Sequence, residues 1–166
     1  NPSVGEEWRR GWHPERIAPK GSDATVLVVG AGPAGLEAAR ALGQRGYAVT
    51  LAEAGEELGG RVTHESRLPG LSAWARARDW RVGRIQEMTN VDVFLGSRLS
   101  VEDVLEYGFS HLVVATGAHW RADGVGVSNW QPIQGSDQAH VLTPEHIYAG
   151  VAIADPALVF DDANFY

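Results

Sequence analysis

The chain has 166 residues, enough for one domain with a sizeable hydrophobic core. Its formal net charge of −7 disfavours a nucleic-acid partner, because phosphate backbones attract basic surfaces. It has no cysteine and no uncharged apolar run long enough to span a membrane, so we expect a cytoplasmic protein without disulfides, thiolate metal ligands or a membrane partner.

Residues 1–22 show no hydrophobic periodicity. They mix glycine, proline and charged residues with Trp8 and Trp12. This composition predicts an extended arm that leads into the first strand. Because indole rings are unfavourable in water, we expect the arm to pack against another surface.

A βαβ unit is predicted over residues 24–53. The apolar run 25–29 is typical of a buried parallel strand, and the alanine- and leucine-rich stretch 36–42 predicts a helix. Gly46 stands where a left-handed residue would end that helix, and a second strand follows over 47–52. The pattern predicts an α/β fold with a parallel, Rossmann-type sheet.

The turn between the first strand and the helix has the spacing of a dinucleotide fingerprint. Gly30 permits the tight turn, Gly32 lets a pyrophosphate approach the backbone, and Gly35 lets the helix pack close to the strand. Pro33 suits the first helical turn, and the N–H groups that follow, beginning at Ala34, face the phosphate together with the positive end of the helix dipole. A glycine turn in another α/β protein is the alternative, but the strand and helix on either side favour nucleotide binding.

Glu53 ends the second strand, 18 residues beyond Gly35. Its carboxylate can accept both hydroxyls of an adenosine ribose and would repel a 2′-phosphate, so we expect the site to reject NADP-type ligands. Ala54, which follows, is included among the predicted nucleotide-binding residues.

A second glycine pair, Gly59 and Gly60, precedes Arg61. Such a sequence can form a backbone nest near a phosphate, with the guanidinium holding an oxyanion. An ordinary glycine turn with a solvated arginine is an equally good interpretation.

Residues 71–88 predict a helix with an apolar face and four arginines, which favour a solvated face over a phosphate or an acidic partner. A strand follows over 91–95, and Ser100 with Asp103 predicts an N-cap and a short helix through residue 107. The apolar run 111–115 predicts another strand, placed centrally because it has no polar alternation.

Thr116 and Gly117 follow this strand at the sheet edge where open α/β folds bind ligands. Residues 118–137 are irregular, Thr143 and Pro144 predict the start of a short helix over 145–149, and residues 157–160 predict a terminal strand. Because that strand has no partner after it, we expect the chain to be part of a longer polypeptide. We assign 1–22 to the arm, 23–153 to the first part of an adenine-dinucleotide-binding domain, and 154–166 to the truncated start of a second nucleotide-fold subdomain.

The fingerprint from Gly30 to Glu53 resembles that of the FAD-binding, glutathione-reductase-like proteins, as do LGGR at 58–61 and ATG at 115–117. The segment GEEWRRGWHPER at 5–16 is more specific, and it resembles the trimethylamine, dimethylamine and histamine dehydrogenases. The segments RLPGLSAW at 67–74, LGSRL at 95–99 and VVATGA at 113–118 are similar to that family too.

This resemblance implies a longer flavoprotein oxidoreductase that removes an amine oxidatively. Its barrel domain would hold FMN, and its cysteines would hold an iron–sulfur cluster. An electron-transfer protein would accept the electrons, and the full-length protein would be a homo-oligomer. The chain would begin after the last cluster cysteine, so by itself we expect it to be inactive. The related 2,4-dienoyl-CoA reductases hold FAD in the equivalent module, whereas trimethylamine dehydrogenase holds ADP; a purely structural ADP site is a third possibility.

The resemblance also implies roles for individual residues. The phosphates would lie against the glycine loop, the ribose against Glu53, the pyrophosphate near Arg61, the adenine against the backbone of Leu99, and the adenosine beside Thr116 and Gly117. The residues carried over as phosphate ligands are Gly30, Gly32, Pro33 and Ala34.

Overall fold

The computed structural model describes residues 17–162 of the chain. The predicted packing of Trp8 and Trp12 concerns residues outside this range. The chain divides into two compact units, residues 1–117 and residues 118–166, which are described separately.

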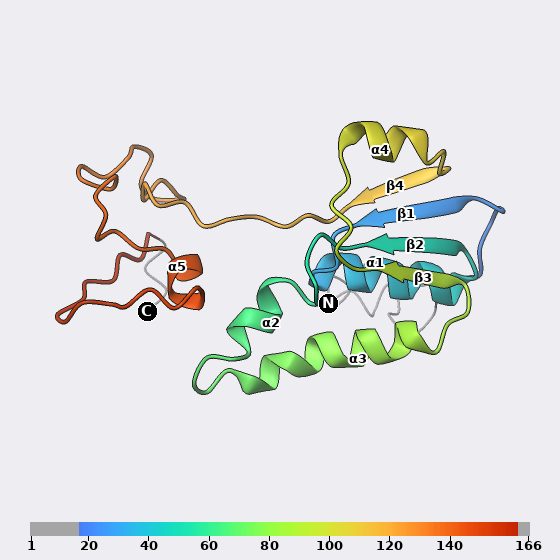
Figure 1. Cartoon of the computed structure of the whole chain (residues 1–166), viewed down its shortest axis with the longest axis horizontal. Coiled ribbons are helices and arrows are strands. Elements are labelled where there is room, and N and C mark those ends of the chain that lie inside the picture. The colour runs from blue at the N-terminus through green and yellow to red at the C-terminus, as the bar shows by residue number, and fades with distance from the viewer. Residues whose placement is uncertain (1–16, 163–166) are drawn as a thin grey trace. The chain divides into compact units, whose positions relative to one another are not determined.

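Unit 1 is built on a four-stranded parallel sheet, which confirms the predicted α/β fold (Figure 1). Its strands are β1 (Thr25–Val29), β2 (Ala48–Ala52), β3 (Val91–Phe94) and β4 (His111–Val114), in the order β3-β2-β1-β4. The last residues of the strands are in register, because Val29 pairs with both Ala52 and Val114. The loops that leave the four strands therefore share one edge of the sheet.

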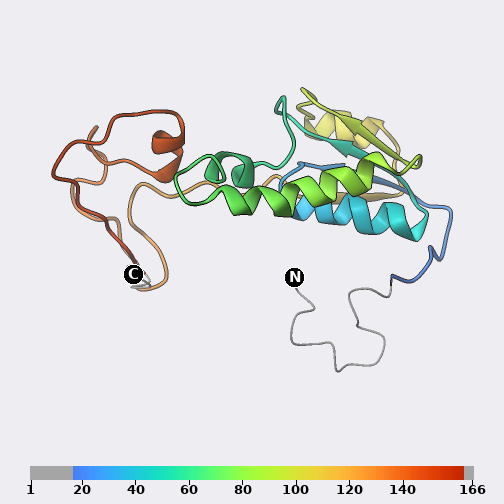
Figure 2. The ribbon, with the colours of Figure 1, turned by 90° about the horizontal axis from the view of Figure 1, so that it is seen from below.

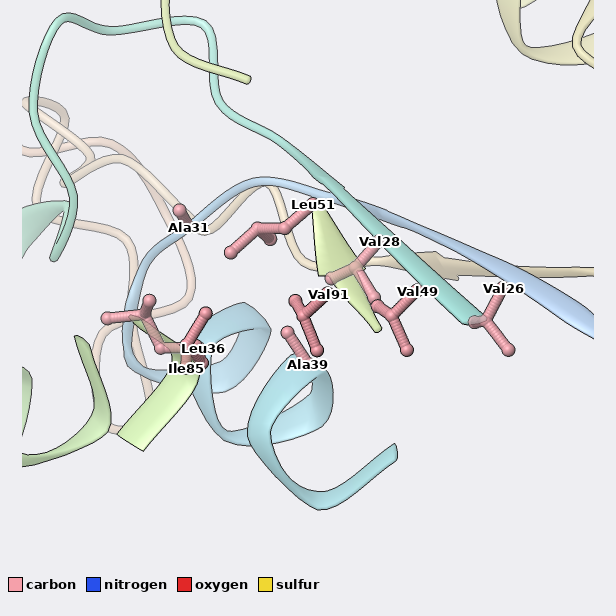
Figure 3. Close-up of a cluster of buried hydrophobic side chains, with 9 residues drawn as sticks. All are labelled: Val26, Val28, Ala31, Leu36, Ala39, Val49, Leu51, Ile85 and Val91. Carbon is pink, nitrogen blue, oxygen red and sulfur yellow. The ribbon is translucent and has the colours of Figure 1, made fainter. Parts of the chain in front are cut away.

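Two long helices, α1 (Pro33–Arg45) and α3 (Ala75–Gln86), lie along one face of the sheet (Figure 2). Four valines of β1, β2 and β3 and Leu51 of β2 pack there against Leu36 and Ala39 of α1 and against Ile85 of α3 (Figure 3). As predicted, Pro33 opens α1 and Gly46 ends it in the left-handed conformation, at φ +95°.

An ion-pair network joins α1 to α3. Glu37 accepts two hydrogen bonds from Arg40, of 2.6 and 3.1 Å, and one of 2.7 Å from Arg81 on α3. The guanidinium of Arg40 is nearly buried and lies 5.1 Å from the ring centre of Trp80. Arg81 of α3 therefore connects the two helices through its ion pair with Glu37 of α1, so this arginine has a structural partner instead of lying on a purely solvated face.

Shorter helices complete unit 1. They are α2 (Arg61–Glu65), the 3₁₀ turn η1 (Ser72–Trp74) and α4 (Val101–Glu106). The prediction for α4 is confirmed in detail, since Ser100 and Asp103 form a reciprocal capping box. The single helix predicted over 71–88 instead begins as η1 and ends at Gln86.

The predicted central position of β4 is wrong within the described residues. β4 lies at the edge of the sheet beside β1, and Leu112 and Val114 are 47% and 67% exposed. A continuous apolar strand indicates that both faces can be covered, but it does not say which strand is at the edge, because pairing on its outer side depends on another segment.

Unit 2 contains the helix α5 (Pro144–Tyr148), capped by Thr143 as predicted, with His146 completing the capping box. The strand predicted over 157–160 is wrong: these residues are not in a strand, and Leu158 and Val159 are almost fully exposed. A strand is stabilised by backbone hydrogen bonds to a neighbouring strand, and the described part of unit 2 contains no strand that could provide them. Over residues 17–162, no helix combines the length and apolar character needed to cross a bilayer.

Candidate functional site: the carboxyl edge of the parallel sheet

The loops that leave the strands are joined by backbone hydrogen bonds. Gly30 donates to the carbonyl of Ala52 and Ala115 to that of Val29, both at 2.8 Å, so the loops after β1, β2 and β4 meet. Glu53 donates to the carbonyl of Phe94 at 2.8 Å, which brings in the loop after β3. The predicted site residues that follow β1, β2 and β4 are therefore assembled at one edge.

The glycine loop is tightly packed at its ends and open in its middle. A Cβ at Gly30 would lie 2.5 Å from the carbonyl oxygen of Ala115 and 3.1 Å from the Cα of Thr116. A Cβ at Gly35 would lie 1.8 Å from the carbonyl oxygen of Gly30. At Gly32, by contrast, a Cβ would meet nothing within 4 Å. The backbone at Gly32 is thus accessible to a ligand, while its neighbours hold the turn against the sheet.

The start of α1 faces the same space. Gly32 is the N-cap of this helix and contributes no side-chain hydrogen bond, and Pro33 and Ala34 are exposed. N–H groups in the first turn of a helix have no intrahelical partner, and together with the helix dipole they attract anions. The position is therefore suited to a phosphate.

Glu53 binds the backbone of two loops. Its Oε2 accepts a hydrogen bond of 2.6 Å from the N–H of Ala31, and its Oε1 accepts one of 2.8 Å from the N–H of Gly55. Sequence reasoning placed Glu53 at this edge but missed both bonds, because hydrophobic periodicity carries no information about contacts between loops.

The second glycine pair lies directly against the first loop. Gly59 donates to the carbonyl of Ala31 at 2.8 Å, and a Cβ at Gly60 would be 3.1 Å from the Cα of Gly32. Gly60 is also the N-cap of α2, so Arg61 begins that helix, with its Nε 3.9 Å from a carboxylate oxygen of Glu65. Both glycines have positive φ, +111° and +52°.

A buried hydroxyl fixes this second loop. Thr63 donates to the carbonyl of Leu58 at 2.8 Å and accepts a hydrogen bond of 3.1 Å from Arg78 of α3. Beside it, an open groove of about 570 Å³ is lined by Leu58, Arg78, Val82 and Leu95, among others. No local pattern in the sequence indicates this groove, because it depends on how α3 lies against the loops.

The remaining predicted residues are less closely joined to the loop. The N–H of Gly96 donates to the carbonyl of Gly55, and the N–H of Ser97 donates to the carbonyl of Glu53. Ala54 stands between these two acceptors in the chain and is exposed. Leu99 follows two residues later, half-buried, and within residues 17–162 no hydrogen bond links it to the glycine loop.

Gly117 follows Thr116 in the left-handed region, at φ +80°, where unit 1 ends. No group of His, Asp or Glu side chains within residues 17–162 is arranged to hold a metal ion.

Comparison with known proteins gives similar relatives for most of the chain. It is 45% identical over 157 residues to the dimethylamine dehydrogenase of Hyphomicrobium sp. (strain x), an alignment that covers 90% of this chain and 21% of that protein. It is 32% identical to the N,N-dimethylglycine/sarcosine dehydrogenase of Chromohalobacter salexigens, over 86% of this chain and 23% of that protein. The chain thus spans about a fifth of the length of these relatives.

Solved structures agree with the sequence relatives. Histamine dehydrogenase from Rhizobium sp. 4-9 superposes with a TM-score of 0.81 at 55% identity, over 92% of this chain and 22% of that one. The 6-hydroxypseudooxynicotine amine oxidase of Pseudomonas geniculata N1 gives a TM-score of 0.85 at 55% identity, over 91% and 23%. These matches confirm the resemblance to amine dehydrogenases that the segments at 5–16 and 67–74 indicated.

A family model described as pyridine nucleotide-disulphide oxidoreductase matches residues 24–147. The match starts one residue before β1 and includes the glycine loop, Glu53 and the second glycine pair. The chain therefore belongs to the pyridine nucleotide-disulphide oxidoreductase family.

Proposed function

We propose that unit 1 binds an adenine nucleotide, ADP or FAD, at the carboxyl edge of its sheet. The observation that carries this proposal is the open space over Gly32 at the start of α1, with the Glu53 carboxylate beside it. Backbone N–H groups of the glycine loop and the helix dipole would bind the pyrophosphate, and Glu53 would bind the ribose.

The proposed binding residues come from every loop at this edge. Arg61 starts the helix that follows Gly60, next to Gly32, and we propose that its guanidinium would counter the phosphate charge. The full set is Gly30, Gly32, Pro33, Ala34, Gly35, Glu53, Ala54, Gly60, Arg61, Leu99, Thr116 and Gly117. None of these residues is proposed as catalytic.

In the whole protein, we propose that this unit is the nucleotide-binding module of an amine-oxidising flavoprotein. The support is the similarity to the dimethylamine and histamine dehydrogenases, of which this chain matches 21% and 22% of the length. FMN, which would take up the electrons of the amine, and an iron–sulfur cluster would lie in other parts of that protein. An electron-transfer protein as acceptor and a homo-oligomeric state belong to the same proposal, and the chain alone would oxidise no amine.

A second candidate is the FAD-binding module of an NAD(P)H-dependent oxidoreductase that resembles the 2,4-dienoyl-CoA reductases. It is favoured by a TM-score of 0.71 and 31% identity to a 2-naphthoyl-CoA reductase, over 92% of this chain and 21% of that one. A structural ADP that takes no part in turnover is the third candidate.

The ligand released from the purified, heat-denatured chain separates the reductase type from the two candidates that hold ADP. A flavin absorbance in the supernatant means FAD and favours the reductase type, whereas colourless ADP, identified by chromatography, favours the amine-dehydrogenase type or a structural site. If no nucleotide is released and calorimetry detects binding of neither ADP nor FAD, the proposal is wrong.

Two variants, one that removes the charge and one that reverses it, test the proposed role of Glu53. A hydrogen bond to a charged group contributes about 1.5–3 kcal/mol, so Glu53→Ala is expected to weaken ADP binding by roughly tenfold to a hundredfold. Glu53→Arg would relieve the repulsion of a 2′-phosphate and raise the affinity for 2′-phospho-ADP relative to ADP. Unchanged preference in calorimetry would show that Glu53 does not face the ribose.

A further inference from the structure

We propose that Glu53 is also a positioning residue, which holds the glycine loop in its phosphate-binding shape before a nucleotide arrives. This inference rests on the proposed nucleotide site and adds to it a second role for the same carboxylate. It depends on the contacts of Ala31, the residue between the two glycines that begin the loop.

Ala31 is fully buried and held on both sides. Its N–H donates to Glu53 Oε2 at 2.6 Å, and its carbonyl accepts from the N–H of Gly59 at 2.8 Å. The first bond fixes the peptide plane before Ala31, and the second fixes the plane after it. That second plane carries the N–H of Gly32, the residue at which an added Cβ would meet nothing within 4 Å.

The carboxylate is the acceptor that satisfies this buried N–H. A buried backbone donor without a partner is unfavourable, so removing the carboxylate leaves the loop either with an unpaired N–H or with a rotated peptide. Gly30 and Gly32 on either side of Ala31 make rotation of the peptide easy, because glycine adopts φ and ψ values that are unfavourable for other residues. Such a rotation would turn carbonyl oxygens toward the place where a phosphate binds.

The positioning role and the charge of Glu53 therefore have opposite effects on the affinity for phosphate: the charge lowers it, and the positioning of the loop raises it. A carboxylate near an anion is repulsive, so a Glu53 that contacted only the ribose would, when removed, leave pyrophosphate binding unchanged or strengthen it. A Glu53 that positions the loop would, when removed, weaken the binding of pyrophosphate, which has no ribose.

Two measurements on the full chain test this role, with Glu53→Ala compared with Glu56→Ala. Glu56 is an exposed carboxylate in the same loop, so its variant matches the loss of charge. Amide hydrogen exchange of the nucleotide-free protein, followed by NMR, reports the loop directly. We expect exchange at Ala31 and Gly55 to accelerate at least about tenfold in Glu53→Ala and to stay at the parent's rate in Glu56→Ala.

Titration with inorganic pyrophosphate is the second measurement. We expect Glu53→Ala to bind it about tenfold more weakly than the parent, and Glu56→Ala to bind it as tightly or more tightly. Glu53→Asp keeps the charge but is shorter by one methylene, so it is expected to weaken pyrophosphate binding as well. This variant also provides the test if Glu53→Ala does not fold by circular dichroism.

The outcomes distinguish this role from the site itself. If the parent binds ADP and pyrophosphate but exchange at Ala31 is unchanged in Glu53→Ala, or pyrophosphate binding is as tight as the parent's, the positioning role is wrong and the site remains. If the parent binds neither ligand, the nucleotide site is wrong, and the positioning role fails with it.

Discussion

Replacing Gly35 by alanine is expected to destabilise unit 1 strongly. Gly35 lies in the first turn of α1, and a Cβ there would be 1.8 Å from the carbonyl oxygen of Gly30, far below the 3.0 Å that real Cβ contacts keep. Because the obstacle is backbone, no side chain can rotate away. The start of α1 would have to move by more than an ångström, away from the strand against which Leu36 packs.

The magnitude follows from the cost of overpacking. Extra atoms in a packed core usually cost about 1–3 kcal/mol, and a contact with backbone belongs at the upper end, so we expect about 3 kcal/mol. For a unit of this size, that corresponds to a fall of roughly 10–25 °C in the thermal midpoint.

Circular dichroism at 222 nm during heating measures this fall, with Gly83→Ala on α3 as the control. A Cβ at Gly83 meets nothing within 4 Å, so the same chemical change lacks the clash. If Gly35→Ala melted within about two degrees of the parent, the close packing of α1 on the first loop would be refuted.

Three further predictions use the same chain. Gly32 has an ordinary φ of −68° and a Cβ there would meet nothing within 4 Å, so Gly32→Ala should melt at the same temperature as the parent. Because the added methyl group would occupy the space of the pyrophosphate, the variant should bind ADP at least about tenfold more weakly in calorimetry, and equal affinity would mean that the pyrophosphate binds elsewhere. Gly83→Ala should raise the free energy of unfolding in urea by about 0.5–1 kcal/mol, because alanine is the better helix former; a decrease would mean that the position is crowded. Partial burial raises the pKa of Glu37, but the hydrogen bonds and charges of Arg40 and Arg81 outweigh it and hold the pKa below its usual 4.5. The stability from this lowered pKa is present above pH 4.5 and lost as the pH falls through the folded value, so Glu37→Gln should lower the urea midpoint at pH 7 by an amount that vanishes in acid; a constant difference would contradict the ion pairs.

Local patterns predicted most of unit 1. The strand at 25–29, the start and end of α1, and the capping box of α4 depend on neighbours in the chain, and all are observed. The strand predicted over 91–95 is observed too, and it ends one residue earlier, at Phe94. The central position of β4 and the strand over 157–160, which are both wrong, concern pairing with segments distant in sequence. An apolar run of four or five residues records that a strand can be buried, but not which segment lies beside it.

For the candidate site, the sequence by itself determined which residues stand at the carboxyl ends of the strands. The glycine spacing and Glu53 could be read from it because each answers a local requirement for a turn, a close approach or a charge. Only the tertiary structure decided that Ala31 connects Glu53 to Gly59, since these bonds join loops that meet only when the parallel strands are in register. Backbone N–H and C=O groups are the same in every residue, so their pairing between loops leaves no trace in the sequence and is set by the register of the sheet.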